Sequence, residues 1–172
     1  VLGIDYGSGE TVAVVADPGG GWRPVLVEGQ ARLSSAVCLV DGGIRTGAAA
    51  LWAAVERPDA FEAQPLRRLS EGDVLLGGGK VAVLDLVAAT LRVVADAAAS
   101  AVGGPVGSVV VTVPAGWGPR RRTLLRQAAH RAGLAEVRLV EAPVAVAGWL
   151  AATGTTVAVG SWVGVCDLRA GV

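Results

Sequence analysis

The stretch VVVTVPAGWGPRRRTLLRQAAHRAGLAEVRLVEAPVAVAGWL, from Val109 to Leu150, decides the fold. Its opening run Val109–Val113 is almost continuously apolar, which is typical of a strand buried on both faces of a sheet. Pro119 then suits the first turn of a helix, and the apolar residues after it recur at helical spacing. A second strand is expected over Val137–Val140 and a second helix over Ala145–Ala152. This alternation predicts a layered α/β fold.

The residues before this stretch predict a strand meander and two helices. Apolar residues recur every three or four positions from Leu84 to Val102, which indicates a long amphipathic helix ended by Gly103. A shorter helix is expected over Ala48–Glu56. Strands are expected at Val1–Ile4, Thr11–Ala16, Trp22–Val27 and Ala36–Val40, with Ile44–Arg45 pairing back, and beyond the decisive stretch at Val157–Val159 and Val163–Cys166.

Length and composition limit the classes of protein. The 172 residues suffice for one domain or one large lobe with a core. Fifteen basic and fifteen acidic residues cancel, which disfavours binding to nucleic acid or to an anionic membrane. No apolar run reaches the ~18 residues of a membrane span. No signal peptide is recognisable and methionine is absent, so we expect a piece of a longer protein. Cys38 and Cys166 are expected to be small buried hydrophobes, which favours a reducing, cytoplasmic setting.

The segment VLGIDYGSGETVAVVAD, Val1 to Asp17, has two interpretations. It places Asp5 at the end of a strand, directly before Gly7-Ser8-Gly9. One interpretation is a plain hairpin, which is the more frequent use of such a turn. The other is a phosphate-binding turn, because glycines let backbone N–H groups approach an anion and a neighbouring carboxylate can hold Mg²⁺ through water.

The Val109–Leu150 stretch resembles the DnaK-type (seventy-kilodalton heat-shock) chaperones and, more broadly, the actin-like ATPases. Further segments resemble that family in the same order. The opening turn resembles the family's first phosphate loop, and the later segments resemble the regions that follow it. These are Val27–Ser35 (after the third strand), Arg45–Gly47 (before an alanine-rich helix), Phe61–Gly72 (the segment with the catalytic lysine) and Val163–Val172 (the second phosphate loop).

The resemblance implies an actin-like, ribonuclease H-like α/β lobe, with a mixed sheet flanked by helices. The outer subdomain is reduced, because the segment from Gly72 to Leu84 is short. Only the first lobe is covered, with a core of about residues 1–33 and 103–172 and an outer portion of about 34–102. The second lobe is absent.

The resemblance also implies ATP and Mg²⁺ as ligands of the full-length parent. The nucleotide-binding positions are then Asp5, Gly7, Ser8, Gly9, Thr11, Arg169 and Gly171. The metal-linked carboxylates are Asp5 and Asp167. The catalytic positions are Arg67, Glu141 and Asp167.

Several positions depart from the family pattern. Arg67 or Arg68 stands where the family keeps a lysine, and both could instead be solvated helix charges; Arg67 is favoured. Glu141 lies one residue from the family's glutamate, and it could simply be an acid favoured by the start of a helix. After Asp167 the chain has Leu168-Arg169-Ala170-Gly171-Val172 where the family has three glycines and a threonine. Two glycines and the hydroxyl are missing, so side chains obstruct backbone approach to a phosphate. Glu10 would repel a triphosphate unless it points away.

These departures leave three functions open for the parent. The first is an ATP-binding, DnaK-like chaperone with weak or degenerate ATPase activity, acting on protein clients. The second is an inactive scaffold, and the third a bacterial actin-like filament protein. The chain alone is expected to be inactive as an enzyme. Three successive arginines, Arg120–Arg122, form either a solvated face or an anion patch, and His130 lacks the spacing of a metal ligand.

Overall fold

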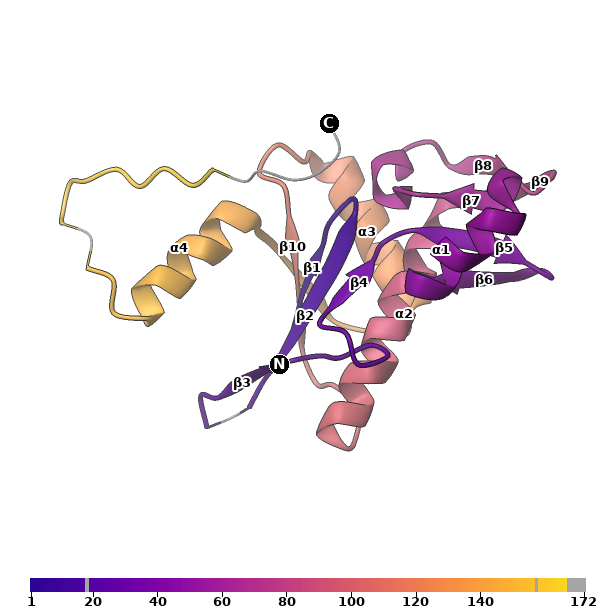
Figure 1. The fold of residues 1–172 in the computed structure, drawn as a ribbon. Coiled ribbons are helices and arrows are strands. Elements are labelled where there is room, and N and C mark those ends of the chain that lie inside the picture. Colours follow the sequence, from indigo (N-terminus) through magenta and orange to yellow (C-terminus); the bar gives the residue numbers. More distant parts are fainter. Residues whose placement is uncertain (18, 157, 167–172) are drawn as a thin grey trace.

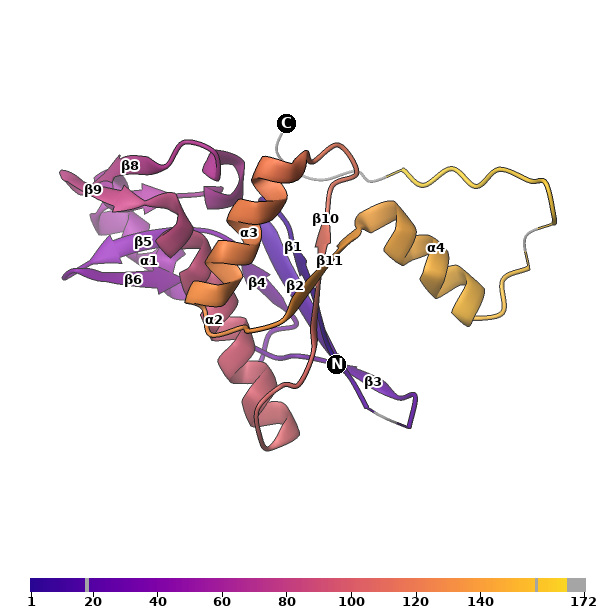
Figure 2. The same cartoon turned by 180° about the vertical axis from the view of Figure 1, so that it is seen from behind.

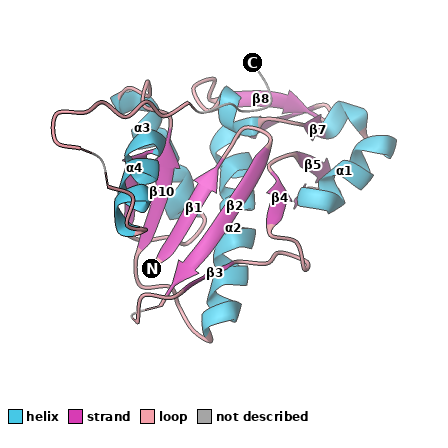
Figure 3. Ribbon diagram, turned by 60° about the vertical axis from the view of Figure 1, so that its left-hand side comes forward, coloured by secondary structure: helices cyan, strands magenta, loops and turns pink. Residues whose placement is uncertain are grey.

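A computed structural model describes residues 1–17, 19–156 and 158–166 of the chain. Its centre is a six-stranded mixed sheet in the order β11-β10-β1-β2-β3, with β4 paired to β2 (Figure 3). β1 is parallel to β10, and β10 to β11, whereas the pairs formed by β2 are antiparallel. The strands are β1 (Leu2–Tyr6), β2 (Glu10–Ala16), β3 (Trp22–Pro24), β4 (Arg32–Ser34), β10 (Val109–Val113) and β11 (Val137–Glu141).

Helices cover both faces of this sheet. α2 (Val83–Val102) and α3 (Pro119–Arg131) lie together on one face, and α4 (Ala142–Ala152) lies on the other (Figures 1 and 2). α2 ends at Gly103, whose φ of 72° is left-handed and suits glycine. α4 is apolar on all sides, and three of its large side chains are exposed: Val144, Val146 and Trp149.

A smaller outer part extends from the core sheet. It contains a three-stranded sheet in the order β6-β5-β7 and a two-stranded hairpin, β8-β9. Its elements are β5 (Val37–Val40), β6 (Gly43–Thr46), α1 (Gly47–Glu56), the 3-10 turns η1 (Pro58–Ala60) and η2 (Pro65–Arg68), β7 (Phe61–Glu62), β8 (Asp73–Leu76) and β9 (Gly79–Ala82).

Strand alternation assigns the two faces of the core sheet. Leu2, Ile4 and Tyr6 of β1 are buried in the core that α2 and α3 cover. Asp5 lies between them in sequence, so its side chain points to the α4 face. Val37 and Leu66 of the outer part belong to the same buried cluster, so one core joins the two parts.

The α/β class, with a mixed sheet flanked by helices, is confirmed. Two expectations were wrong. Residues 158–166 form no strand among the described residues, and Cys166 in that segment is exposed rather than buried. The β8-β9 hairpin was not predicted. α2, which the sequence places in the outer portion, contacts α3 and β2 of the core as well as β6 and β9 of the outer part. No described helix has both the length and the apolar character that crossing a bilayer requires.

Candidate functional site

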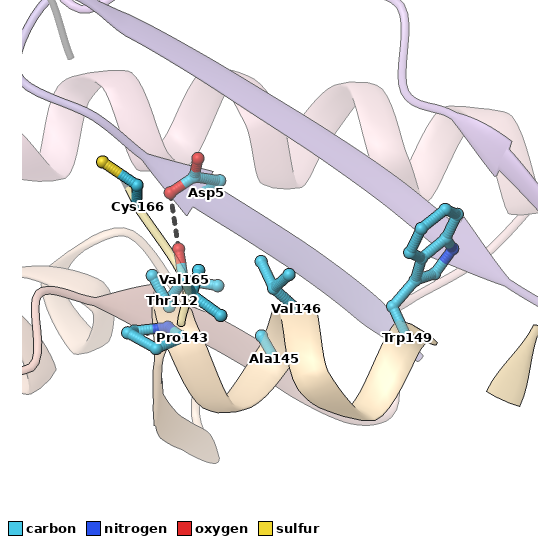
Figure 4. Close-up of a pocket in the computed structure, with 9 residues that line it drawn as sticks. Asp5, Thr112, Pro143, Ala145, Val146, Trp149, Val165 and Cys166 are labelled. Atoms are coloured by element: carbon cyan, nitrogen blue, oxygen red, sulfur yellow. Dashed lines mark hydrogen bonds between the residues drawn. The ribbon is translucent and has the colours of Figure 1, made fainter. Parts of the chain in front are cut away.

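A pocket of about 380 Å³ lies where β1 and β10 end and α4 begins (Figure 4). Its polar side consists of Asp5 and Thr112, and the Thr112 hydroxyl donates a 2.5 Å hydrogen bond to Asp5 Oδ1. The parallel register explains this pair, because Ile4 of β1 lies opposite Val111 of β10 and the next residues point to the same face. The remaining lining residues are Ala142, Pro143, Ala145, Val146, Trp149, Val165 and Cys166.

The turn after Asp5 is a hairpin that Ser35 stabilises through two hydrogen bonds to its carbonyls. The Gly7 N–H donates to the Glu10 carbonyl at 2.9 Å, which closes the turn. Ser35 donates its hydroxyl to the Gly7 carbonyl at 2.8 Å and its N–H to the Gly9 carbonyl at 2.9 Å. The Thr11 hydroxyl is only 2.9 Å from that of Ser35, and both residues are buried. Thr11 therefore lies beneath the turn, and its role as a ligand contact stays a prediction.

The outer side of the same turn is open. Among the described residues, no backbone carbonyl accepts a hydrogen bond from the N–H of Ser8 or Gly9. A Cβ atom at Gly9 would meet no heavy atom within 4 Å, and the Gly9 backbone is not left-handed. Neither backbone conformation nor packing requires a glycine at this position. The turn is thus a hairpin that leaves space for an external group, so the two interpretations of the sequence are compatible.

The carboxylate of Glu10, next to this turn, has a basic partner. Its carboxylate forms a 2.8 Å ion pair with Arg32 of the neighbouring strand β4, where both side chains are largely exposed. The pairing of β2 with β4 places the two residues close together, since Val12 lies opposite Arg32 and Glu10 opposite Ser34. The repulsion expected between Glu10 and a phosphate is thereby reduced.

The two candidate arginines of η2 differ in their surroundings. Arg68 forms 2.8 Å ion pairs with Glu71 and Glu62, and these hydrogen bonds raise the pKa of Arg68 above its ordinary value. Arg67 is exposed and donates to Gln64 Oε1 at 3.2 Å. Neither arginine lines the pocket. Arg68 is thus bound to two carboxylates, and the role of Arg67 at the lysine position stays a prediction.

Glu141 is turned away from the pocket. It is the last residue of β11 and lies opposite Val113, whose side chain is buried on the α3 side. Its carboxylate accepts a 2.6 Å hydrogen bond from Arg122 of α3, which also donates to the Trp117 carbonyl. The next residue, Ala142, lines the pocket instead. The one-residue displacement therefore leaves a methyl group where a carboxylate would face the cavity.

The described residues supply a sparse set of metal ligands. They contain no cluster of three or more His, Cys, Asp or Glu side chains suited to a metal ion. Asp5 and Thr112 are the oxygen-bearing side chains of the pocket lining, a donor type that Mg²⁺ accepts directly or through water. Asp167, Arg169 and Gly171, the residues of the expected second phosphate loop, lie outside the described residues.

Comparisons with known proteins identify relatives of the chain. A family model described as "Hsp70 protein" matches residues 72–157. The chain is 29% identical over 150 residues to the chaperone protein DnaK of Mycoplasma mycoides subsp. mycoides SC, covering 86% of this chain and 25% of that protein. It is 29% identical over 154 residues to DnaK of Cenarchaeum symbiosum, covering 84% and 23%, and 30% identical over 155 residues to DnaK of Elusimicrobium minutum, covering 86% and 25%. The chain thus spans about a quarter of the length of these relatives.

Proposed function

The chain belongs to the Hsp70 protein family, and from that premise we propose that it is the first lobe of the nucleotide-binding domain of a DnaK-like chaperone. The match to three DnaK proteins over most of the chain supports the chaperone class. We keep the proposed division into a core and an outer portion, with α2 contacting both. Protein clients and a cytoplasmic location are part of the same proposal.

The observation that carries the nucleotide proposal is the Asp5–Thr112 pair beside an open glycine turn. In this proposal the N–H groups of Ser8 and Gly9 bind phosphate oxygens, as successive backbone donors do in anion-binding loops. Thr112 fixes the orientation of the Asp5 carboxylate, which would hold Mg²⁺ through its water ligands. Bound Mg²⁺ supplies positive charge that neutralises the phosphates. Val146 and Trp149 form an apolar wall on the α4 side (Figure 4).

We further propose that ATP hydrolysis in the whole protein is weak. Support comes from Ala142, which lines the pocket while the neighbouring carboxylate of Glu141 is bound to Arg122. The segment Leu168–Val172 adds side chains where the family has glycines. A preorganised donor at a transition state contributes roughly 2.7–4 kcal/mol, so losing one slows a reaction by about two to three orders of magnitude.

An NMR titration of the chain with ATP, with and without Mg²⁺, tests the nucleotide proposal. We expect amide shifts at Ser8, Gly9 and Thr112 that are larger with Mg²⁺. Asp5→Asn should remove the Mg²⁺ dependence. The matched control is Asp41→Asn, in the β5-β6 turn, where φ is 50° and asparagine is readily accommodated. Shifts confined to other surfaces, or an Mg²⁺ effect that Asp5→Asn does not alter, would contradict the proposal.

The second candidate is a scaffold without catalysis, and the Glu141–Arg122 pair favours it. A single-turnover assay on the whole protein separates the two. The test variant combines Arg169→Gly, Ala170→Gly and Val172→Thr, which restores the family's loop residues. We expect hydrolysis to accelerate if the loop limits catalysis. No acceleration would favour the scaffold, or a limit set by the displaced Glu141.

A further inference from the structure

One face of α1 is apolar and uncovered. Leu51, Trp52 and Val55 are 49%, 78% and 79% exposed, whereas the opposite face buries Gly47 and Ala50. Side chains three and four positions apart are neighbours on a helix, so Val55 adjoins both Trp52 and Leu51 and joins the three into one patch. We call this patch, Leu51, Trp52 and Val55, the α1 patch. Contiguous exposed apolar groups of this kind mark interaction sites in folded proteins.

The α1 patch adjoins a pocket of about 360 Å³. Ala48 and Leu51 of α1 form one side, and Val27 and Leu33 contribute apolar surface on the other. α1 lies beside β4, which brings this helix next to the core sheet (Figure 3). The pocket gives the patch a concave end into which an apolar side chain of a partner fits.

An acidic residue stands at each end of this surface. Glu28 lines the pocket, and Glu56 is one helical turn beyond Trp52. Neither forms an ion pair with any residue that the structure describes. Arg32, the basic residue of the pocket lining, is already paired with Glu10.

Glu28 also occupies a strained backbone position. Val27 and Gln30 form an isolated bridge with hydrogen bonds of 3.0 and 2.9 Å, and Glu28 and Gly29 make the two-residue turn between them. The φ of Glu28 is 51°, in the region where Gly, Asn and Asp are the usual residues. Such strain is concentrated at functional positions. The carboxylate is thus held at the rim of the pocket by an unfavourable turn.

We propose that the α1 patch and its pocket bind an amphipathic segment of a partner protein, with an apolar centre and a basic residue at each end. α1 spans ten residues, or about 15 Å, which sets the scale of the segment. A second copy of this chain is disfavoured, because a two-fold contact through this face would oppose acidic residues to acidic residues. Gly9 of the opening turn also lines this pocket, but the proposal rests on the α1 patch and the two glutamates and requires no bound nucleotide.

Two synthetic helical peptides serve as probes. Both carry a leucine stripe; one has two lysines at each end and its twin has two glutamates. Fluorescence anisotropy with labelled peptides measures affinity for the chain. We expect the lysine peptide to bind at least tenfold more tightly than its twin. We expect two variants to weaken binding of the lysine peptide at least about fivefold. They are Trp52→Ser and the double variant Glu28→Gln with Glu56→Gln. All substituted residues are exposed, so circular dichroism should show an unchanged fold.

The matched control is Leu75→Ser, which removes an equally exposed apolar side chain from β8 and should leave binding unchanged. Failure of the lysine peptide to bind, equal binding of the two peptides, or an equal loss with Leu75→Ser would overturn the proposal. Sedimentation that shows a dimer of the chain, abolished by Trp52→Ser, would overturn it in favour of a second copy.

Discussion

Gly9 is a glycine that the fold does not need. An added Cβ would meet nothing within 4 Å, and the backbone is not in the left-handed region. Replacing such a glycine by alanine usually stabilises a protein by about 0.4–1 kcal/mol, because the unfolded chain loses freedom. A side chain there would nevertheless project from the open turn where we propose that phosphate binds. Stability and binding should therefore respond in opposite directions.

We predict that Gly9→Ala leaves the free energy of unfolding unchanged or slightly raised and weakens Mg·ATP binding at least tenfold, or about 1.4 kcal/mol. Urea denaturation and the NMR titration measure the two effects. Gly107→Ala is the matched control, since it also meets nothing within 4 Å and lies before β10, away from the pocket. Equal binding by wild type and Gly9→Ala would show that no ligand approaches this turn closely.

Gly47 is the opposite case. Its φ is 61°, and a Cβ there would approach Leu33 Cδ1 to within a distance that real atoms do not reach. We predict that Gly47→Ala lowers the free energy of unfolding by roughly 2–5 kcal/mol, from left-handed strain of about 1–2 kcal/mol and overpacking of about 1–3 kcal/mol. Chemical denaturation measures this loss. A loss below about 0.5 kcal/mol would mean that Leu33 moves aside and the strain is relieved.

At the scale of elements, the Arg122–Glu141 pair joins α3 to the end of β11. The side chains are 24% and 38% exposed, against 73% and 58% for the Arg32–Glu10 pair. Partial burial reduces solvent screening, so the inner pair should be the stronger one. We predict a coupling energy of about 1 kcal/mol for Arg122–Glu141 and below about 0.5 kcal/mol for Arg32–Glu10.

Two double-mutant cycles check this difference. One combines Arg122→Ala with Glu141→Gln, and the other combines Arg32→Ala with Glu10→Gln. Unfolding free energies from thermal or urea denaturation give each coupling. The distinction fails if the two couplings are equal, or if the exposed pair is the stronger.

The sequence predicts the elements whose signal is local. The apolar repeat of Leu84–Val102 and the run Val109–Val113 give α2 and β10 within a residue or two. The β8-β9 hairpin was missed, although Gly77-Gly78 between two short apolar runs is a turn signal. The strand predicted over Val163–Cys166 is absent for a different reason. β-branched residues favour a strand mainly through packing against a neighbouring strand.

The candidate site likewise combines features that the local sequence predicts with features that depend on contacts between distant residues. The position of Asp5 at the end of β1 follows from the sequence pattern. Its hydrogen bond with Thr112 does not, because that bond joins residues 107 positions apart and depends on the register of β1 and β10. The support of the turn by Ser35 is also non-local. The turn of Glu141 toward Arg122 depends on strand parity, which a one-residue uncertainty in β11 would reverse.

At the scale of the whole molecule, the lobe offers one wall of the proposed nucleotide site. Pocket residues come from β1, β10, α4 and the segment after α4, and the pocket is largely apolar. We predict that the chain alone shows no appreciable ATP turnover and binds ATP more weakly than micromolar, which corresponds to less than about 8 kcal/mol of binding free energy. Isothermal calorimetry and a phosphate-release assay measure both. Micromolar affinity would show that this lobe is sufficient to hold the nucleotide.

The all-round apolar character of α4 has a consequence for how the isolated chain behaves in solution. Val144, Val146 and Trp149 are exposed, while the formal net charge is zero and the pI is about 6.8. Molecules without net charge lack long-range electrostatic repulsion, so their exposed apolar surfaces associate more readily near neutral pH. We expect colloidal attraction to be greatest close to pH 7 and to decline toward pH 9, where the chain is anionic. Static light scattering should show a second virial coefficient that is lowest near neutrality and rises with pH, and Trp149→Ser, which removes apolar surface without changing the net charge, should raise it at every pH.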